Sequence, residues 1–303
     1  MADDPNWPRA STWIRACTDE HAWPAARRPR PVQMALIGVP AHATSISPTR
    51  ADTTPAAIRA ALARYSTFVA SADLDLAELM LVDLGDQSDP DTPDGERATI
   101  EAVRLFPRAP VLALGGDNSI TFAVAHGACA DGLITLDAHH DLRDGRSNGS
   151  PVRRLVEAGI EGQRVVQIGI SDFANSPVYA ARARELGITV ITRAELERRP
   201  MADAMAEALE IASGGPTARV HVDLDVDVCD RSVAPACPAS LPGGIGAREL
   251  LTAARAAGAD PRVVSMDITE VDASADAPDG RTVRLAALCV LEIATGVLLR
   301  GQH

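Results

Sequence analysis

Cysteine pairs at metal-binding spacing are absent from this sequence of 303 residues. The cysteines number five, lie far apart and form no CxxC pair, so they indicate neither a disulfide framework nor a structural zinc site. We expect buried or incidental thiols at all five positions, which are Cys17, Cys129, Cys229, Cys237 and Cys289.

Long apolar runs and an excess of positive charge are also absent. No stretch approaches the ~20 apolar residues that span a bilayer, and the start, MADDPNWPRAS, lacks the basic-then-apolar order of a secretory signal. Acidic residues outnumber basic ones by 41 to 29, whereas nucleic acids and anionic membranes usually bind clustered Lys and Arg. We therefore expect a cytoplasmic globular protein with no nucleic-acid or membrane partner, whose extra carboxylates suit metal cations.

Residues 1–32 differ from the rest of the chain, because they hold all three Trp and end in the Pro/Arg-rich AARRPRP. We interpret them as an irregular N-terminal arm, packed on a domain or on another subunit. In 33–303, apolar runs of strand length alternate with Ala-rich segments of helical spacing, which predicts one α/β domain with a buried parallel sheet. The runs are 34–39, 79–84, 111–116, 133–138, 165–170, 188–191, 220–226 and 263–268, and the helical segments include 55–65, 97–106, 201–212 and 253–258.

Two clusters of acidic residues coincide with predicted strand ends. Asp137, His139 and Asp141 recur at every second position, and an extended backbone sends alternate side chains to one face. Asp225 and Asp227 have the same spacing on another apolar strand. Because the carboxyl ends of parallel strands converge on one crevice, we expect the two clusters to meet there.

Ionised carboxylates packed together in a low-dielectric crevice require cations, and neither cluster contains Lys or Arg. Four Asp charges balance two divalent ions, and oxygen-rich coordination with one imidazole favours Mn²⁺. Two such ions about 3.5 to 4 Å apart can lower the pKa of a shared water and deliver hydroxide to an electrophilic carbon. Taken alone, either cluster could be a capped turn or a solvated edge strand, but the two together favour a metal-dependent hydrolase.

Four blocks of the sequence resemble, in the same order, the signature blocks of the ureohydrolase superfamily of arginases, agmatinases and formimidoylglutamases. They are GGDNS (115–119), DAHHDLR (137–143), DLDVDVCDRSVAPACPASLPGG (223–244) and DITEVD (267–272), and the correspondence spans 34–298. The resemblance implies an arginase-like, three-layer domain with an eight-stranded, mainly parallel sheet, and a homo-oligomer, usually a trimer or hexamer. It also implies metal ligation by Asp137, His139, Asp141, Asp225 and Asp227, with Asp141 beside the attacking water.

Several segments resemble the formimidoylglutamase branch, namely SNGSPVRRL (147–155), VVQIGISDFANSPVY (165–179) and APACPASLPGG (234–244). This branch hydrolyses N-formimidoyl-L-glutamate to L-glutamate and formamide in histidine degradation. An agmatinase or another hydrolase of guanidino compounds that releases urea is the alternative. A non-catalytic binding or regulatory protein that retains the fold is the alternative from a different class.

Two positions depart from the superfamily pattern. Asn118 stands where a metal-ligating His is usual, and its neutral carbonyl oxygen is a weaker ligand, so we expect lower affinity for one of two ions. Asn148 stands where arginases and agmatinases place a His proposed to shuttle protons, and a general acid is worth roughly 10²- to 10⁴-fold in rate. This absence argues against arginase activity. His126 and His140 could substitute, but we expect a surface His126 on the helix after GGDNS and a packed or exposed His140.

The remaining expectations concern the substrate. Glu270 matches the superfamily carboxylate that faces the planar cationic end of the substrate, where charge-assisted hydrogen bonds hold it. We expect Arg143 to bind a substrate carboxylate, assisted by Asn148 and Ser150. For Arg153 and Arg154 we expect pairing with local acids on a helix surface.

Overall fold

The computed structural model describes residue 4 and residues 6–16, 31–215 and 217–300, so Cys17, Trp23 and residues 25–30 of the AARRPRP segment lie outside it. Within this part of the chain, one sheet of nine strands has the order β1-β5-β2-β6-β11-β10-β7-β8-β9, and every pairing is parallel. The strands are β1 (Arg15–Ala16), β2 (Met34–Val39), β5 (Leu81–Asp86), β6 (Val111–Gly115), β7 (Gly132–Leu136), β8 (Val165–Ile170), β9 (Thr189–Thr192), β10 (Val220–Asp225) and β11 (Val263–Thr269).

The eight apolar runs predicted as strands correspond to β2 and to β5 through β11, so the predicted fold class is confirmed. The ninth strand, β1, comes from the N-terminal arm and pairs with β5 at the edge of the sheet. Its two residues are too few to give an alternation pattern in the sequence, which is why the arm reads as irregular. A separate antiparallel pair, β3 (Phe68–Val69) and β4 (Leu74–Asp75), lies outside the main sheet.

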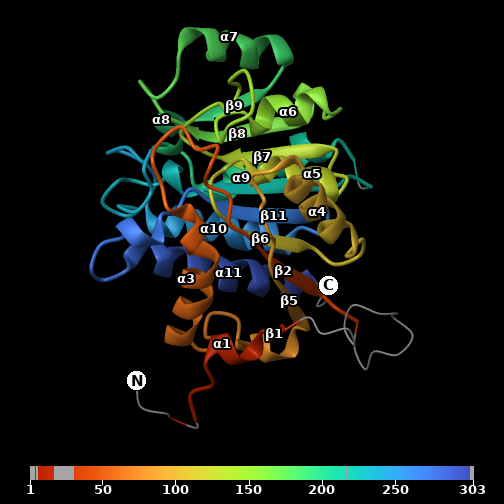
Figure 1. The fold of residues 1–303 in the computed structure, drawn as a ribbon, viewed down its shortest axis with the longest axis vertical. Helices are drawn as coiled ribbons and strands as arrows, with labels where there is room; N and C mark the ends of the chain where they lie inside the picture. The colour runs from red at the N-terminus through yellow and green to blue at the C-terminus, as the bar shows by residue number, and fades with distance from the viewer. Residues whose placement is uncertain (1–3, 5, 17–30, 216, 301–303) are drawn as a thin grey trace.

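Helices cover both faces of the sheet (Figure 1). One layer contains α3 (Thr54–Ala61), α9 (Met201–Ser213), α10 (Ala247–Ala259) and α11 (Arg281–Leu299). The other contains α4 (Pro93–Arg104), α5 (Ile120–Gly127), α6 (Pro151–Glu157) and α7 (Pro177–Leu186). Short helices complete the list: α1 (Ala10–Trp13), α8 (Arg193–Leu196), and the 3₁₀ turns η2 (Ala51–Thr53), η3 (Leu62–Arg64), η4 (Leu76–Glu78), η5 (Gly162–Arg164), η6 (Val226–Val228) and η7 (Ala273–Ala275).

The strands contribute side chains to both layers because successive residues of a strand point to opposite faces. In β2, Met34 and Leu36 belong to the core beneath α3 and α11, whereas Ala35 and Ile37 belong to the core beneath α4 and α5. All six residues of β2 are buried, as are those of β8 and β10. Burial on both faces explains why these strands are continuously apolar in sequence.

Helix α11 is long and apolar enough, by length and composition alone, to cross a membrane. In the structure 72% of that apolar window is buried, and the helix packs against α10 and α3. It also carries Arg284 and Glu292, and it forms the long central helix of one layer. Core packing therefore accounts for its composition.

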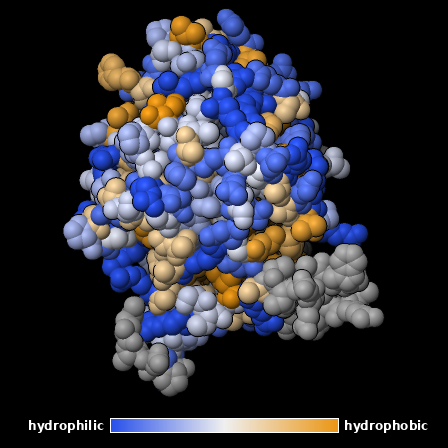
Figure 2. All heavy atoms as spheres, in the orientation of Figure 1, coloured by the Kyte–Doolittle hydropathy of each residue, from blue (hydrophilic) through white to orange (hydrophobic). Residues whose placement is uncertain are grey.

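The face drawn in Figure 2 mixes polar side chains with scattered apolar ones.

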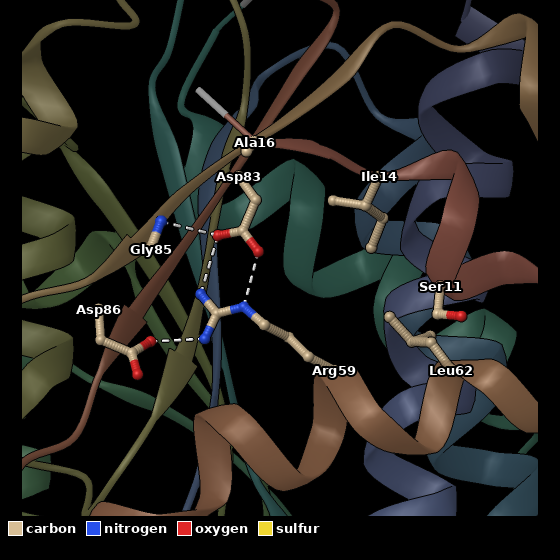
Figure 3. A pocket seen from close by; sticks show the side chains of 8 residues that line it. All are labelled: Ser11, Ile14, Ala16, Arg59, Leu62, Asp83, Gly85 and Asp86. Atoms are coloured by element: carbon tan, nitrogen blue, oxygen red, sulfur yellow. Dashed lines mark hydrogen bonds and ion pairs between the residues drawn. The ribbon is translucent and has the colours of Figure 1, made fainter. Parts of the chain in front are cut away.

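The described part of the arm attaches to the edge of the sheet. The indole Nε1 of Trp13 donates to the carbonyl of Leu79 at 3.0 Å, and β1 adds its two residues to β5. Nearby, Arg59 of α3 donates to Asp83 and Asp86, at the carboxyl end of β5, and closes one side of a cavity of about 400 Å³ (Figure 3). The division of the chain into residues 1–32 and 33–303 stays a prediction.

Candidate metal centre

Four neighbouring strands at the centre of the sheet carry the polar blocks. In the order β6, β11, β10 and β7, they lead at their carboxyl ends to Asn118, Glu270, Asp225 and Asp137. The close approach of two loops requires glycine here, because a Cβ on Gly116 would lie 2.0 Å from the carbonyl oxygen of Ala41. The parallel register thus collects side chains that are far apart in sequence at one edge.

His139 joins the two acidic clusters. Its Nδ1 lies 2.7 Å from Oδ2 of Asp227 and 3.4 Å from Oδ1 of Asp137, and one donor atom from each of the three lies within 4.8 Å of the others. Both carboxylates are buried, and Oδ2 of Asp137 has no hydrogen-bond partner among the described residues. The expected meeting of acidic groups from β7 and β10 is therefore present.

Asp141 and Asp225 line the same cavity as His139 and Asp227. Oδ1 of Asp225 accepts the backbone N–H of Asp227 at 2.8 Å, which fixes the start of turn η6, and Oδ2 of Asp141 accepts the side-chain amide of Asn118 at 2.8 Å. The backbone at Asp141 has a φ of 51°, a strained conformation for a residue with a side chain. Such strain is typical of functional sites.

Burial and mutual repulsion disturb the titration of these groups. Burial, followed by the charges of neighbouring carboxylates, raises the pKa of Asp137 and of Asp225 well above the ordinary value. Burial also raises the pKa of Asp141 to about 7. Burial would lower the pKa of His139, but the carboxylates of Asp227 and Asp137 raise it to about 12. A divalent cation would replace that proton, because imidazole ligates metals in its neutral form.

Glu270 lies at the other side of the cluster, with a φ of 63°. Its Oε1 accepts the backbone N–H of Asn118 at 2.8 Å and the side-chain amide of Asn148 at 2.9 Å. Burial, followed by the charge of Asp117, raises the pKa of Glu270 to about 8. The second carboxylate oxygen makes no hydrogen bond within the described chain, so it is available to a ligand.

Asn118 lies beside the acidic cluster, and hydrogen bonds fix the orientation of its side-chain amide. Its Oδ1 accepts the hydroxyls of Thr121 at 2.7 Å and Thr269 at 3.2 Å, while Nδ2 donates to Asp141. In this orientation the carbonyl oxygen faces two hydroxyl donors, and the amide supports Asp141. The role of Asn118 as a metal ligand stays a prediction.

The substrate-side residues separate into two groups. Arg143, Asn148 and Glu270 line a cavity of about 210 Å³ together with the acidic cluster. Ser150 is buried outside that lining, and its hydroxyl donates to the carbonyl of Ser147 at 2.8 Å. As expected, Arg153 pairs with a local acid, Glu157. Arg154 also pairs with an acid, but its partner is Glu96 on the distant α4 and both side chains are largely buried.

Three side chains near the cavity were not singled out in the sequence. Tyr179 and Asn175 line it, and both lie in the segment 165–179 quoted for its family resemblance. Asn175 accepts the backbone N–H of His140 at 2.9 Å and donates to the carbonyl of Ala138 at 2.9 Å, so it braces the loop that carries His139. Ile46 comes from the loop after β2, which shows no motif that could have identified it.

A second set of buried polar residues lies within β10 and β11, before the carboxyl ends that carry the metal centre. Nε2 of His221 lies 3.2 Å from Oδ2 of Asp267, and Asp267 pairs with Asp223 across β10 and β11. Asp230 lies at the turn after β10, where it accepts the backbone N–H groups of Ser232 and Gly243. These residues orient backbone and side chains rather than lining the cavity.

Of the two histidines considered as substitutes, His140 is packed, whereas His126, expected at the surface, is half-buried. His140 is buried with its Nδ1 2.7 Å from Oε1 of Gln167. His126 is half-buried on α5 and stacks on the ring of Phe122, with 5.6 Å between ring centroids. Neither lines the cavity.

The chain is similar to known proteins along most of its length. Residues 32–296 match the model of the arginase family. The chain is 38% identical over 282 residues to formimidoylglutamase from Halalkalibacterium halodurans, covering 88% of each chain. A crystal structure of formimidoylglutamase from Bacillus subtilis superimposes with a TM-score of 0.87 at 31% identity, covering 98% of this chain and 94% of the other.

A more distant structure shows the same fold. Trypanosoma cruzi formiminoglutamase with Mn²⁺ has a TM-score of 0.82 at 22% identity, covering 96% of this chain and 98% of that one. The family-model match and the 38% identity each extend over most of the sequence. The chain belongs to the arginase family.

Proposed function

We propose that this protein hydrolyses N-formimidoyl-L-glutamate to L-glutamate and formamide with the help of divalent metal ions. The observation that carries the proposal is the buried cluster of Asp137, His139, Asp141, Asp225 and Asp227 at neighbouring strand ends, in a chain similar along most of its length to formimidoylglutamase. Water adds to the formimidoyl carbon, and the bond from that carbon to the glutamate nitrogen breaks.

The residues present fit a metal site. The unpartnered, buried Oδ2 of Asp137 and the raised pKa of Asp137 and Asp225 indicate carboxylates that lack a counterion. Asp137, His139, Asp141, Asp225 and Asp227 would hold two ions, with Asn118 beside them, and the mainly carboxylate donor set favours Mn²⁺. When bound, such ions lower the pKa of a shared water and supply a nucleophile.

Glu270 is suited to bind the cationic formimidoyl group. Two N–H donors hold Oε1, at 2.8 and 2.9 Å, and Glu270 lines the cavity with its other oxygen free of hydrogen bonds in the described chain. A planar amidinium presents paired N–H donors that a carboxylate accepts with charge assistance. The cation also favours the ionised form of Glu270, whose pKa burial raises to about 8.

Asp141 is suited to accept a proton from the attacking water. Asn118 holds one of its oxygens, so the other oxygen is available to the cavity. No histidine lines the cavity opposite it apart from His139, and Asn148 is engaged with Glu270. We expect Asp141 to pass the proton to the departing amine, because its carboxyl group lines the cavity and burial raises its pKa to about 7.

Arg143 favours a substrate with carboxylates over agmatine, which is cationic at both ends. The Arg143 side chain lines the mouth of the cavity, beyond the acidic cluster. A guanidinium there attracts the glutamate end of formimidoyl-glutamate and repels the amine of agmatine. Hydrolysis of a guanidino acid remains the second candidate on this observation, since such a compound also carries a carboxylate.

The test is a substrate panel with added Mn²⁺ and with a chelator. We expect formamide and glutamate from formimidoyl-glutamate only when metal is present, and little urea from agmatine or guanidino acids. Urea release that exceeds formamide release would contradict the substrate assignment. Failure to bind Mn²⁺ in a calorimetric titration, together with no turnover, would favour the non-catalytic alternative.

The cellular setting follows from the proposed reaction. We propose a cytoplasmic enzyme of histidine degradation that acts on a small molecule and assembles as a homo-oligomer, a trimer or hexamer. The N-terminal arm, 1–32, would be a separate contact element of the domain 33–303. Sedimentation of the full chain and of a chain lacking residues 1–32 measures the oligomer size and the contribution of the arm.

A further inference from the structure

Arg143 carries a positive charge that has no hydrogen-bonded or ion-paired partner in the described chain. Its guanidinium makes neither a hydrogen bond nor an ion pair with any residue of 31–215 or 217–300, and the residue is exposed at the cavity mouth. The neighbouring arginines are all engaged: Arg146 and Arg154 contact Glu96, Arg153 contacts Glu157, and Arg182 contacts Asp144. One unpaired guanidinium therefore marks the outer end of the cavity.

The ring of Tyr179 lies close to both Arg143 and Arg182. The Cζ atoms of the two arginines are 5.9 and 5.7 Å from the ring centroid, within the range of cation–π attraction. Arg182 is fixed, because its Nη1 donates to the carbonyl of Leu142 at 2.5 Å and to Asp144 at 2.9 Å. The ring of Tyr179 is thus close to two guanidinium groups, of which that of Arg182 is paired and that of Arg143 is not.

The backbone around both side chains is also constrained. Ser176 caps α7 by accepting the N–H of Tyr179 at 3.3 Å, and the N–H of Arg143 donates to the carbonyl of Gly149 at 2.9 Å. Gly149 leaves room for the stem of Arg143, since a Cβ at that position would lie 2.7 Å from its Cδ. The direction of the Arg143 side chain is therefore set by Gly149 and Tyr179.

The other polar side chains expected to assist Arg143 are already engaged. Asn148 donates to Glu270 and accepts the N–H of Ile46, and the hydroxyl of Ser150 is used within its own turn. Asn175 uses both ends of its amide on the loop backbone. The phenol oxygen of Tyr179, by contrast, makes no hydrogen bond within the part of the chain that the structure describes.

We propose that Tyr179 completes a carboxylate-binding site with Arg143: its ring positions the guanidinium, and its hydroxyl donates a second hydrogen bond to the substrate carboxylate. This inference rests on the proposed function, in which Arg143 binds the glutamate end of the substrate. An arginine and a phenol hydroxyl that both donate to one carboxylate distinguish a dicarboxylate from a diamine. The ligand class of this subsite is therefore a carboxylate anion.

The test compares Tyr179→Phe, which keeps the ring, with Tyr179→Leu, which removes ring and hydroxyl, and with Arg143→Gln. For formimidoyl-glutamate we expect Tyr179→Phe to raise KM about 10-fold, the value of one charge-assisted hydrogen bond, with kcat nearly unchanged. Tyr179→Leu should raise KM further, towards the value of Arg143→Gln. The double variant Arg143→Gln/Tyr179→Leu should be little worse than Arg143→Gln alone, because the two side chains act as one site.

Two substrate analogues identify the carboxylate. N-formimidoyl-L-glutamine lacks the side-chain charge, and N-formimidoyl-4-aminobutyrate lacks the α-carboxylate. We expect the KM effect of the Tyr179 variants to disappear with one of the two. Tyr65→Phe is the matched control, because Tyr65 is the other tyrosine of the chain and its hydroxyl contacts the carbonyl of Arg284 away from the cavity. Its KM should equal that of the wild type.

Unchanged KM in both Tyr179 variants would overturn the inference, as would a loss confined to kcat or an equal effect on all three substrates. Calorimetric titration with glutarate provides a readout independent of turnover. If the wild type does not hydrolyse formimidoyl-glutamate, the proposed function fails, and weaker glutarate binding by Tyr179→Leu still supports the subsite. If the wild type does hydrolyse it while glutarate binds every variant equally, the inference about Tyr179 alone is wrong.

Discussion

Replacement of Asn118 by His tests the metal centre at its least conventional position. The amide of Asn118 now donates to Asp141 at 2.8 Å and accepts the hydroxyls of Thr121 and Thr269 at 2.7 and 3.2 Å. An imidazole at this position brings a nitrogen donor towards the cluster but does not reproduce all three bonds. Two opposite effects are therefore expected: a less stable protein without metal and a tighter site with Mn²⁺.

The magnitudes follow from the contacts that change. Loss of three buried hydrogen bonds, at about 0.5 to 1.5 kcal/mol net each and partly replaced by the imidazole, lowers the free energy of unfolding of the metal-free protein by about 1 to 3 kcal/mol. Mutation of a residue that only contacts a metal-ligating side chain already changes metal affinity about 10- to 100-fold. A new metal-ligating side chain should change the affinity by at least ~10-fold, so we expect Mn²⁺ at the weaker site to bind at least ~10-fold more tightly.

Calorimetric titration of metal-free protein with Mn²⁺ measures both sites, and electron paramagnetic resonance reports the fraction of free Mn²⁺. Asn118→Ala is the control, because it removes the amide without adding a ligand. The ranking of substrates should be the same in Asn118→His as in the wild type. If Asn118→His and Asn118→Ala both bind Mn²⁺ as the wild type does, residue 118 is not adjacent to the metal, and the placement of the weaker site is wrong.

Three further predictions follow from the site. Glu270→Gln should lower kcat/KM for formimidoyl-glutamate about 10- to 100-fold, because a charge-assisted contact becomes a neutral one, and unaltered Mn²⁺ binding separates this from damage to the metal site. Asn175→Ala should weaken Mn²⁺ binding about 10-fold, because the loop that carries His139 loses two hydrogen bonds, while the far-ultraviolet circular dichroism stays unchanged. Equal Mn²⁺ affinity in the variant and the wild type would show that Asn175 does not position this loop. Without metal, the thermal stability should fall between pH 5 and pH 8. The folded pKa values of Asp141 and Glu270 are about 7 and 8, whereas the unfolded values are about 4. The stability that these two groups contribute is therefore fully present below pH 4 and is lost as the pH rises through the folded pKa values. With Mn²⁺ the profile should be flat or inverted over the same range, and a metal-free profile that rises with pH would contradict the reasoning.

The strands and the acidic clusters could be predicted from the sequence because both are local patterns. All strands of the main sheet except β1 come from mainly apolar runs, and Asp137, His139 and Asp141 alternate within five residues. Parallel topology then places the blocks at one edge without further information. The edge strand β1 could not be predicted in this way, because two residues at the end of an arm carry no periodicity.

The contacts between loops could not be predicted, because they depend on side-chain direction across distant segments. Asn118 is a single residue that can present either end of its amide, and its hydrogen bonds to Thr121, Thr269 and Asp141 determine which end faces the cluster. Tyr179 meets Arg143 only through the folded positions of α7 and the loop after β7. Spacing in the sequence correctly brought acidic residues of the two clusters together. The expected assistance of Arg143 by Asn148 and Ser150 stays a prediction, and in the structure both side chains have other partners.

The same residues that make the metal centre oppose the stability of the metal-free fold. Asp137, Asp141 and Asp225 are buried, and their raised pKa values mean that the folded chain holds protons which the unfolded chain releases near neutral pH. An apolar sheet buried between two helix layers supplies the stabilisation that tolerates them. Divalent ions would bind to the ionised carboxylates of the folded state, and the unfolded chain has no preformed site for them. Metal binding and folding are therefore expected to be coupled. Chelation should therefore lower the melting temperature most at high pH, where the cluster carries the largest uncompensated charge.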